Sequence, residues 1–152
     1  MRILCAIGIR RGVELVKRVS RIMREGDELV LAHVLDSGPR HDLNHLEGTI
    51  RPHHLQTREI DAAEEDAGNA TLREAAEEAG RIGVPATTRL ARGNPEHVIV
   101  ELAEEVAADL VAVLARERPQ GHPVQGPPSI GHTARFIVDH APVDVLIYRE
   151  RA

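Results

Sequence analysis

The stretch NPEHVIVELAEEVAADLVAVLA, residues 94–115, decides the fold class. Asn94 is a favourable N-cap, and Pro95 suits the first position of a helix. Apolar residues then recur at helical spacing: Ile99, Val100, Leu102, Ala103 and Val106. Residues 109–115 form an apolar run of strand length, which indicates a strand buried on both faces. A helix that leads into such a strand is typical of a parallel α/β sheet.

The same alternation continues in both directions along the chain. Strands are expected at Arg2–Ile9, Glu28–Val34, Val84–Ala91, Asp109–Ala115 and Val143–Tyr148. Helices are expected at Gly12–Arg24, at Gln56–Arg81, from Asn94 onward and at Gly131–His140. Continuous apolar strands that alternate with helices predict an α/β fold. We expect one doubly wound domain, residues 1–152, whose parallel sheet has helices on both faces.

Two loops at one edge of this sheet are the candidate ligand site. In a doubly wound sheet, ligands bind at the carboxyl ends of the strands where the strand order reverses, here the loops after the first and fourth strands. Basic residues gather there: Arg10, Arg11, Arg116, Arg118, His122 and His132. Long loops are expected at residues 36–54 and 116–130, and such loops are usually functional or disordered. This edge is expected either to bind an anionic small molecule or to carry solvated arginines.

The composition argues against several classes of protein. The chain has no Trp, one Phe and one Tyr, so it lacks the rings on which nucleic-acid bases stack. A net charge of −5 also argues against nucleic-acid or acidic-membrane partners. Cys5, the only cysteine, excludes an internal disulfide and is expected to be a buried packing residue of the first strand. No transmembrane run or signal peptide is recognisable, so a cytoplasmic location is expected.

Two segments resemble the sequence of a known protein family. The first begins with Arg92-Gly93-Asn94-Pro95-Glu96, continues through the helical residues Ile99-Val100-Glu101-Leu102-Ala103 and ends with Ala108-Asp109-Leu110-Val111-Ala112-Val113. The second is His140-Ala141-Pro142, which precedes the last strand. In this order and spacing, the chain resembles the universal stress protein family over nearly its whole length. The resemblance implies a five-stranded Rossmann-like sheet and a homodimer paired through the last strand, Val143 to Tyr148. It also implies that ATP or AMP is a candidate ligand, because some members bind these nucleotides.

The ATP-binding motif of that family is altered here. ATP binders have an Asp at the end of the first strand, where this chain has Gly8, and a G-x2-G-x9-G-[S/T] motif after the fourth. Counting back from Gly131 and His132 assigns Gly121 to the second glycine and Arg118 to the first, whereas counting forward from the fourth strand gives Leu114 and Glu117. Either way the first glycine is missing, and a Cβ there would crowd a phosphate. The candidate ligand residues that the resemblance implies are Gly8, Ile9, Arg10, Val34, Val113, Arg118, Gly121, Gly131, His132 and Thr133.

These observations lead to two main hypotheses of function. The first is a non-catalytic stress-response or regulatory protein without the standard mode of ATP binding. The alternative is a module that binds ATP, AMP or another anionic small molecule through a modified loop after the fourth strand. Weak nucleotide hydrolysis is a third hypothesis, disfavoured because no general base is identifiable. A metal site at His41, His45, His53 and His54 is also disfavoured, because no cysteine and only Asp42 stand near them.

Overall fold

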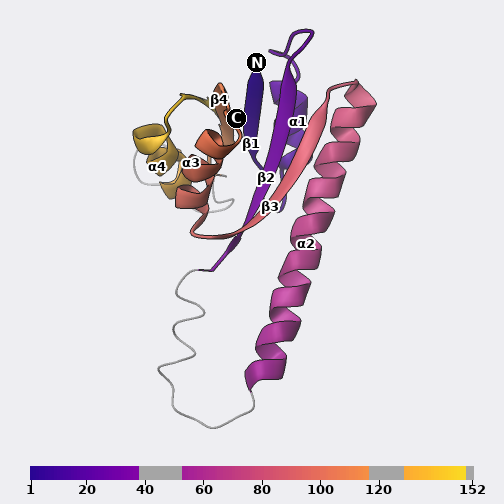
Figure 1. Ribbon diagram of the computed structural model, residues 1–152, viewed down its shortest axis with the longest axis vertical. Coiled ribbons are helices and arrows are strands. Elements are labelled where there is room, and N and C mark those ends of the chain that lie inside the picture. Colours follow the sequence, from indigo (N-terminus) through magenta and orange to yellow (C-terminus); the bar gives the residue numbers. More distant parts are fainter. Residues whose placement is uncertain (38–52, 117–128, 150–152) are drawn as a thin grey trace, which may run out of the picture.

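The computed structural model describes residues 1–37, 53–116 and 129–149, with only the backbone for residues 53–57 (Figure 1). The strands are β1 (Arg2–Ala6), β2 (Glu28–Asp36), β3 (Ala86–Gly93), β4 (Leu110–Leu114) and β5 (Asp144–Tyr148). The helices are α1 (Gly12–Val19), α2 (His53–Ile82), α3 (Pro95–Glu105) and α4 (His132–His140). The α/β class and the alternating order expected from the sequence are therefore confirmed.

All the strands belong to one parallel sheet in the order β3-β2-β1-β4-β5. Cys5 of β1 is in register with Leu31 of β2 on one side and with Ala112 of β4 on the other. From β1 the chain adds β2 and β3 on one side, and it then returns to add β4 and β5 on the other side. The strand order thus reverses between β1 and β4, at the position that the sequence predicts for a ligand site.

Helices cover both faces of the sheet, α1 and α2 on one side and α3 and α4 on the other (Figure 1). Side chains alternate between the faces along β2: Leu29 and Leu31 join Leu15 of α1, whereas Val30 joins Ile99 of α3. Each face therefore has its own apolar cluster, and the sheet separates the two.

The expectation of burial on both faces is correct for the central strands and wrong for β3. Ile3, Leu4 and Cys5 of β1 are fully buried. In β3, however, residues 87–89 are exposed, because this strand lies at the edge of the sheet and is covered mainly on one side by α2.

Several element ends differ from the expected ones for identifiable reasons. Helix α1 ends at Val19 instead of Arg24, because the next amides, those of Arg21 and Ile22, bond to carbonyls three residues back instead of four. Strand β1 ends at Ala6, although the Ile7 amide still donates to the Ala32 carbonyl at 2.7 Å. Helix α2 begins at His53, three residues before the expected start at Gln56.

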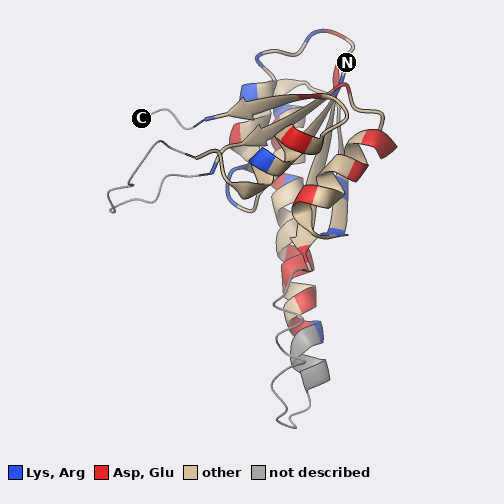
Figure 2. Cartoon of the chain, turned by 90° about the vertical axis from the view of Figure 1, so that its left-hand side faces the viewer, with Lys and Arg blue, Asp and Glu red and all other residues tan. Residues whose placement is uncertain are grey.

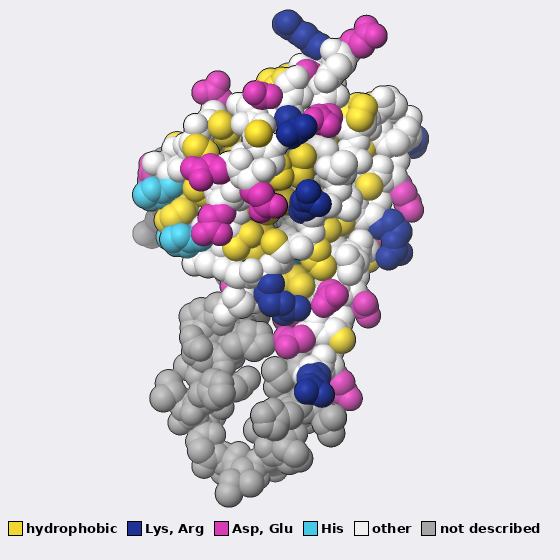
Figure 3. Space-filling model, viewed as in Figure 1, with side chains coloured by type: hydrophobic (Ala, Val, Ile, Leu, Met, Phe, Trp, Pro, Cys, Tyr) yellow, Lys and Arg dark blue, Asp and Glu magenta, His cyan; other side chains and the backbone are white. Residues whose placement is uncertain are grey.

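The first part of α2 extends beyond the sheet and is rich in acidic side chains (Figure 2). Arg92 of β3 anchors it, with Nη2 lying 3.6 Å from Glu65 and Nη1 3.9 Å from Asp61. On the face shown in Figure 3, acidic and basic side chains are interspersed instead of forming a patch of one sign. No helix in the described ranges combines the length and the apolar character needed to span a membrane.

The carboxyl end of β5 is attached to α1. The Tyr148 hydroxyl donates to the Arg18 carbonyl at 3.0 Å, and Arg18 Nη1 donates to the Arg149 carbonyl at 2.7 Å. The Arg18 guanidinium also lies 5.8 Å from the centre of the Tyr148 ring, within range of a cation–π contact. These contacts join residues about 130 positions apart and fix the last strand against the first helix.

Candidate functional site

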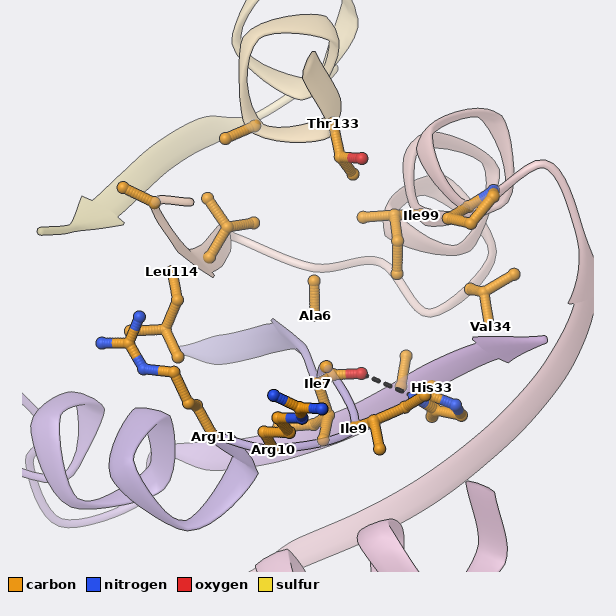
Figure 4. Close-up of a pocket in the computed structure, with 16 residues that line it drawn as sticks. Ala6, Ile7, Ile9, Arg10, Arg11, His33, Val34, Ile99, Leu114 and Thr133 are labelled. Atoms are coloured by element: carbon orange, nitrogen blue, oxygen red, sulfur yellow. Dashed lines mark hydrogen bonds between the residues drawn. The ribbon is translucent and has the colours of Figure 1, made fainter. Parts of the chain in front are cut away.

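A cavity of about 550 Å³ opens at the carboxyl ends of β1 and β4, where the strand order reverses. The residues around it come from the β1–α1 loop, from the ends of β2 and β4, and from the first turns of α3 and α4 (Figure 4). Its walls are mostly apolar. The volume lies within the usual range of small-molecule sites.

Small side chains create the space inside this cavity. Ala6, Ala32, Ala115 and Ala134 line it, and in Figure 4 the Ala6 methyl group projects toward its middle. Larger aliphatic side chains complete the wall: Val34, Ile99, Val113 and Leu114. Such a wall suits an apolar or aromatic body better than a strongly hydrated one.

Two buried polar side chains hold the β1–α1 loop that forms one side of the cavity. His33 Nδ1 lies 2.7 Å from the Ile7 carbonyl, and because a carbonyl only accepts, Nδ1 carries the proton. Thr71 of α2 donates its hydroxyl to the Ile9 carbonyl at 3.4 Å. His33 and Thr71 are 5% and 8% exposed, so both bonds tie the loop to the interior of the protein.

The loop brings two guanidinium groups to the cavity, and their surroundings differ. Arg11 donates from Nε and Nη2 to the two carboxylate oxygens of Glu14, at 2.7 and 3.0 Å. This bonding lowers the pKa of Glu14, mainly through the hydrogen bond and further through the charges of Arg11 and Arg18. Arg10 is exposed, and no carboxylate within the described ranges pairs with it. The mouth of the cavity therefore carries one neutralised cation and one available cation.

The first turn of α4 closes another side. Gly131 is its N-cap with φ of 93°, and a Cβ there would lie 3.0 Å from the Arg116 Cβ, so glycine is required on both counts. Thr133 lines the cavity, while His132 is 82% exposed at its side chain and places Nε2 3.2 Å from the Glu96 carboxylate. The start of α4 thus presents backbone amides near the cavity without a capping side chain.

The family model described as "Universal stress protein family" matches residues 1–149. The chain belongs to the universal stress protein family. No curated protein sequence matches the chain. The fold and the strand order described above agree with this membership, and the resemblance seen in the sequence is confirmed.

Solved structures of this family have the same fold. An Arabidopsis thaliana universal stress protein with AMP bound aligns with a TM-score of 0.67 at 18% identity, over 100% of this chain and 93% of that one. An Archaeoglobus fulgidus universal stress protein in complex with dAMP gives 0.65 at 18% identity, over 97% and 96%. A universal stress protein from Lactobacillus plantarum gives 0.66 at 22% identity, over 98% and 97%.

The structure brings most of the candidate ligand residues together. Gly8, Ile9, Arg10, Val34, Val113 and Thr133 all line the cavity. Gly131 and His132 stand beside it at the start of α4 but are not among the lining residues. Arg118, Gly121 and His122 lie outside the described residues, whereas Arg116 is described and exposed.

Sequence reasoning missed the residues that support the loop. His33 and Thr71 are distant in sequence from the carbonyls they bind, by 26 and 62 positions. A polar residue inside the apolar run of β2 was a usable signal for His33, because a buried polar side chain needs a partner. No comparable signal marked Thr71, which lies in a helix rich in polar residues.

The sequence also singled out Cys5 and a group of histidines as candidates for chemistry. Cys5 is buried as expected, and burial raises the pKa of its thiol to about 12, so it is not a nucleophile at neutral pH. His41 and His45 lie outside the described residues, and the side chains of His53 and His54 are not described. Among the side chains that the structure does describe, no group of three or more His, Cys, Asp and Glu could hold a metal ion.

Proposed function

We propose that this universal stress protein is a non-catalytic, cytoplasmic regulatory protein that binds an anionic small molecule in the cavity between β1 and β4. A nucleoside monophosphate is the first candidate. The observation that carries the proposal is the combination of an aliphatic cavity of about 550 Å³ with the available guanidinium of Arg10 at its mouth. The apolar walls would hold the base, and Arg10 and the amides of α4 would receive the phosphate.

The comparisons support this choice of ligand. Two family members with the same fold were crystallised with AMP and with dAMP, both nucleoside monophosphates. The cavity lies at the carboxyl edge of the reversed strand order, where doubly wound folds bind such ligands. The proposal transfers the ligand class from those proteins to this chain, with AMP as the probe.

The proposal excludes the standard ATP mode of the family. Gly8 stands at the position of the family's Asp, so that carboxylate is missing. The space for it remains, since a Cβ at Gly8 would meet no atom within 4 Å. Restoring the carboxylate by Gly8→Asp would add an acceptor for ligand hydroxyls and is expected to strengthen AMP binding about tenfold.

The lining residues also support a binding role without catalysis. No Asp or Glu is among the described residues that line the cavity. A hydrolytic reaction needs a base that can activate water, and no carboxylate among the described lining residues is placed to do so. Sustained release of inorganic phosphate from ATP by the purified protein would contradict this part of the proposal.

The binding itself can be tested on the purified protein by calorimetric titration with AMP. Because the chain has one Tyr and no Trp, a co-purified purine would dominate its ultraviolet absorption. Arg10→Gln is expected to weaken AMP binding about tenfold, because a charge-assisted hydrogen bond is lost. Arg89→Gln is the matched control, since Arg89 is an exposed arginine on β3, at the sheet edge. Equal losses in both variants, or no AMP binding by the native protein, would contradict the proposal.

We also propose that two copies of the chain associate through β5. This strand pairs only with β4 within the described sheet, and four of its residues are only partly buried. An apolar edge strand is a template for pairing, and a second copy would cover it. Sedimentation that finds only monomers at micromolar concentration would contradict this proposal.

A further inference from the structure

Glu14 pairs with one of two arginines at the mouth of the cavity. Arg10 and Arg11 are consecutive, and both line the cavity. Only Arg11 is bound by a carboxylate, through two hydrogen bonds of 2.7 and 3.0 Å to Glu14. A ligand can therefore use Arg10 directly, whereas it can use these donors of Arg11 only by displacing Glu14.

Glu14 itself is held firmly in this place. Its carboxylate also lies 2.9 Å from Arg18 Nη2, so it bridges two arginines one turn apart. It belongs to the first turn of α1, where the helix dipole favours a negative charge. A second or third phosphate group that took these donors would have to break this bridge and would lie close to the displaced carboxylate. Both effects oppose the binding of polyphosphates.

We propose that Glu14 is a specificity-determining residue that restricts the cavity to ligands with a single anionic group and disfavours diphosphates and triphosphates. This inference rests on the proposed function. It assigns the ligand an apolar or aromatic body, which contacts the aliphatic walls, and one phosphate or carboxylate, which meets Arg10. Glu14 acts on the ligand through Arg11 and is not among the lining residues.

The test compares AMP with ATP, titrated calorimetrically in EDTA so that no divalent cation masks the phosphates. The measured quantity is the ratio of the two dissociation constants. Glu14→Gln removes the competing charge and weakens the two hydrogen bonds that Arg11 donates to it, so the preference for AMP over ATP is expected to fall about fivefold. Adding Arg11→Gln to that variant should restore the native ratio, because the guanidinium that Glu14 neutralises is removed as well.

Glu78→Gln is the matched control. Glu78 also receives two hydrogen bonds from an arginine three residues away, with Arg81 Nε and Nη2 at 2.9 and 2.5 Å from its oxygens. This change alters the net charge by the same amount, but Glu78 lies on α2 near Lys17 of α1 and is not among the residues that line the cavity. The ratio is expected to stay within about a factor of two of the native value.

Glu14→Ala also removes the carboxylate and serves as a second variant if Glu14→Gln folds poorly. Circular dichroism checks the fold of each protein. Glu14→Asp keeps the charge and should retain the preference for AMP. If AMP binds but the ratio is the same in the native protein and in both removal variants, the inference is overturned while the proposed function stands. An equal change in the Glu78→Gln control also overturns it. If the native protein does not bind AMP, the proposed function fails and this inference fails with it.

Discussion

The two faces of the sheet end differently at its carboxyl edge. On the α1/α2 face the packing is tight: a Cβ at Gly68 of α2 would lie 2.8 Å from His33 and 3.1 Å from Leu35. On the α3/α4 face, alanines such as Ala6 and Ala32 leave a cavity of about 550 Å³. Ala32 and His33 are neighbours in the chain and face opposite sides of the same strand. Side-chain size in alternate positions thus makes one face a core and the other a binding site.

The largest expected effect comes from opening a hole on the packed face. Leu31 is fully buried there, and Leu31→Ala should lower the free energy of unfolding by about 3 kcal/mol, as measured by urea denaturation. Ile9, at the cavity, is 67% exposed, and Ile9→Ala should cost less than about 0.5 kcal/mol. Similar losses in the two variants would show that the faces do not differ in packing.

The next effect concerns the bond between His33 and the β1–α1 loop. His33→Phe keeps a ring of similar size but leaves the buried Ile7 carbonyl without its donor, so unfolding should become easier by about 2 kcal/mol. AMP binding should weaken as well, because the loop forms a wall of the cavity. Thr71→Val removes a longer bond of 3.4 Å and should have a smaller effect on both measurements. A larger effect of Thr71→Val would contradict this order.

The pH dependence of Cys5 tests whether the packed face excludes water. Burial raises the pKa of this thiol from 9.0 to about 12, so above pH 9 the unfolded chain loses a proton that the folded chain keeps. The stabilisation is complete below pH 9 and is lost as the pH rises toward 12. Relative to Cys5→Ala, the native protein should lose about 1.4 kcal/mol of stability per pH unit in that window. Parallel stability curves for the two proteins would mean that the thiol is accessible to water.

Filling the cavity is expected to have only a small effect on stability. Ala6→Leu places a larger side chain in empty space, so stability should change by less than about 1 kcal/mol while AMP binding weakens at least about tenfold. Ala79→Leu makes the same change on the packed face, where Ala79 is fully buried, and should destabilise by about 2 kcal/mol. If Ala6→Leu destabilises the protein as much as Ala79→Leu does, the two faces do not differ in how much space they leave.

The sequence was sufficient for the order of the elements because each strand and helix has its own local pattern. The boundaries were less predictable where hydrogen bonding changes without a change in polarity, as after Val19. The exposure of β3 could not be read from its residues alone. It depends on the strand lying at the sheet edge, which is a property of the whole topology.

The candidate site was predictable in its location and only partly in its residues. The reversal of strand order brings Gly8 and Arg10 together with Val113 and Thr133, as the positions of the loops implied. The roles of His33 and Thr71 depend on contacts between distant parts of the chain. The difference between Arg10 and Arg11 depends on the direction of two side chains, which no pattern of residue types specifies.

The attachment of β5 to α1 gives the protein a built-in optical reporter. Tyr148 is the only tyrosine, and there is no tryptophan, so nearly all intrinsic fluorescence comes from one ring. That ring sits on the last strand, with its hydroxyl bonded to the Arg18 carbonyl and the Arg18 guanidinium nearby. Any event that loosens or covers this strand changes the environment of the fluorophore directly. Fluorescence can therefore follow the edge of the sheet without a label.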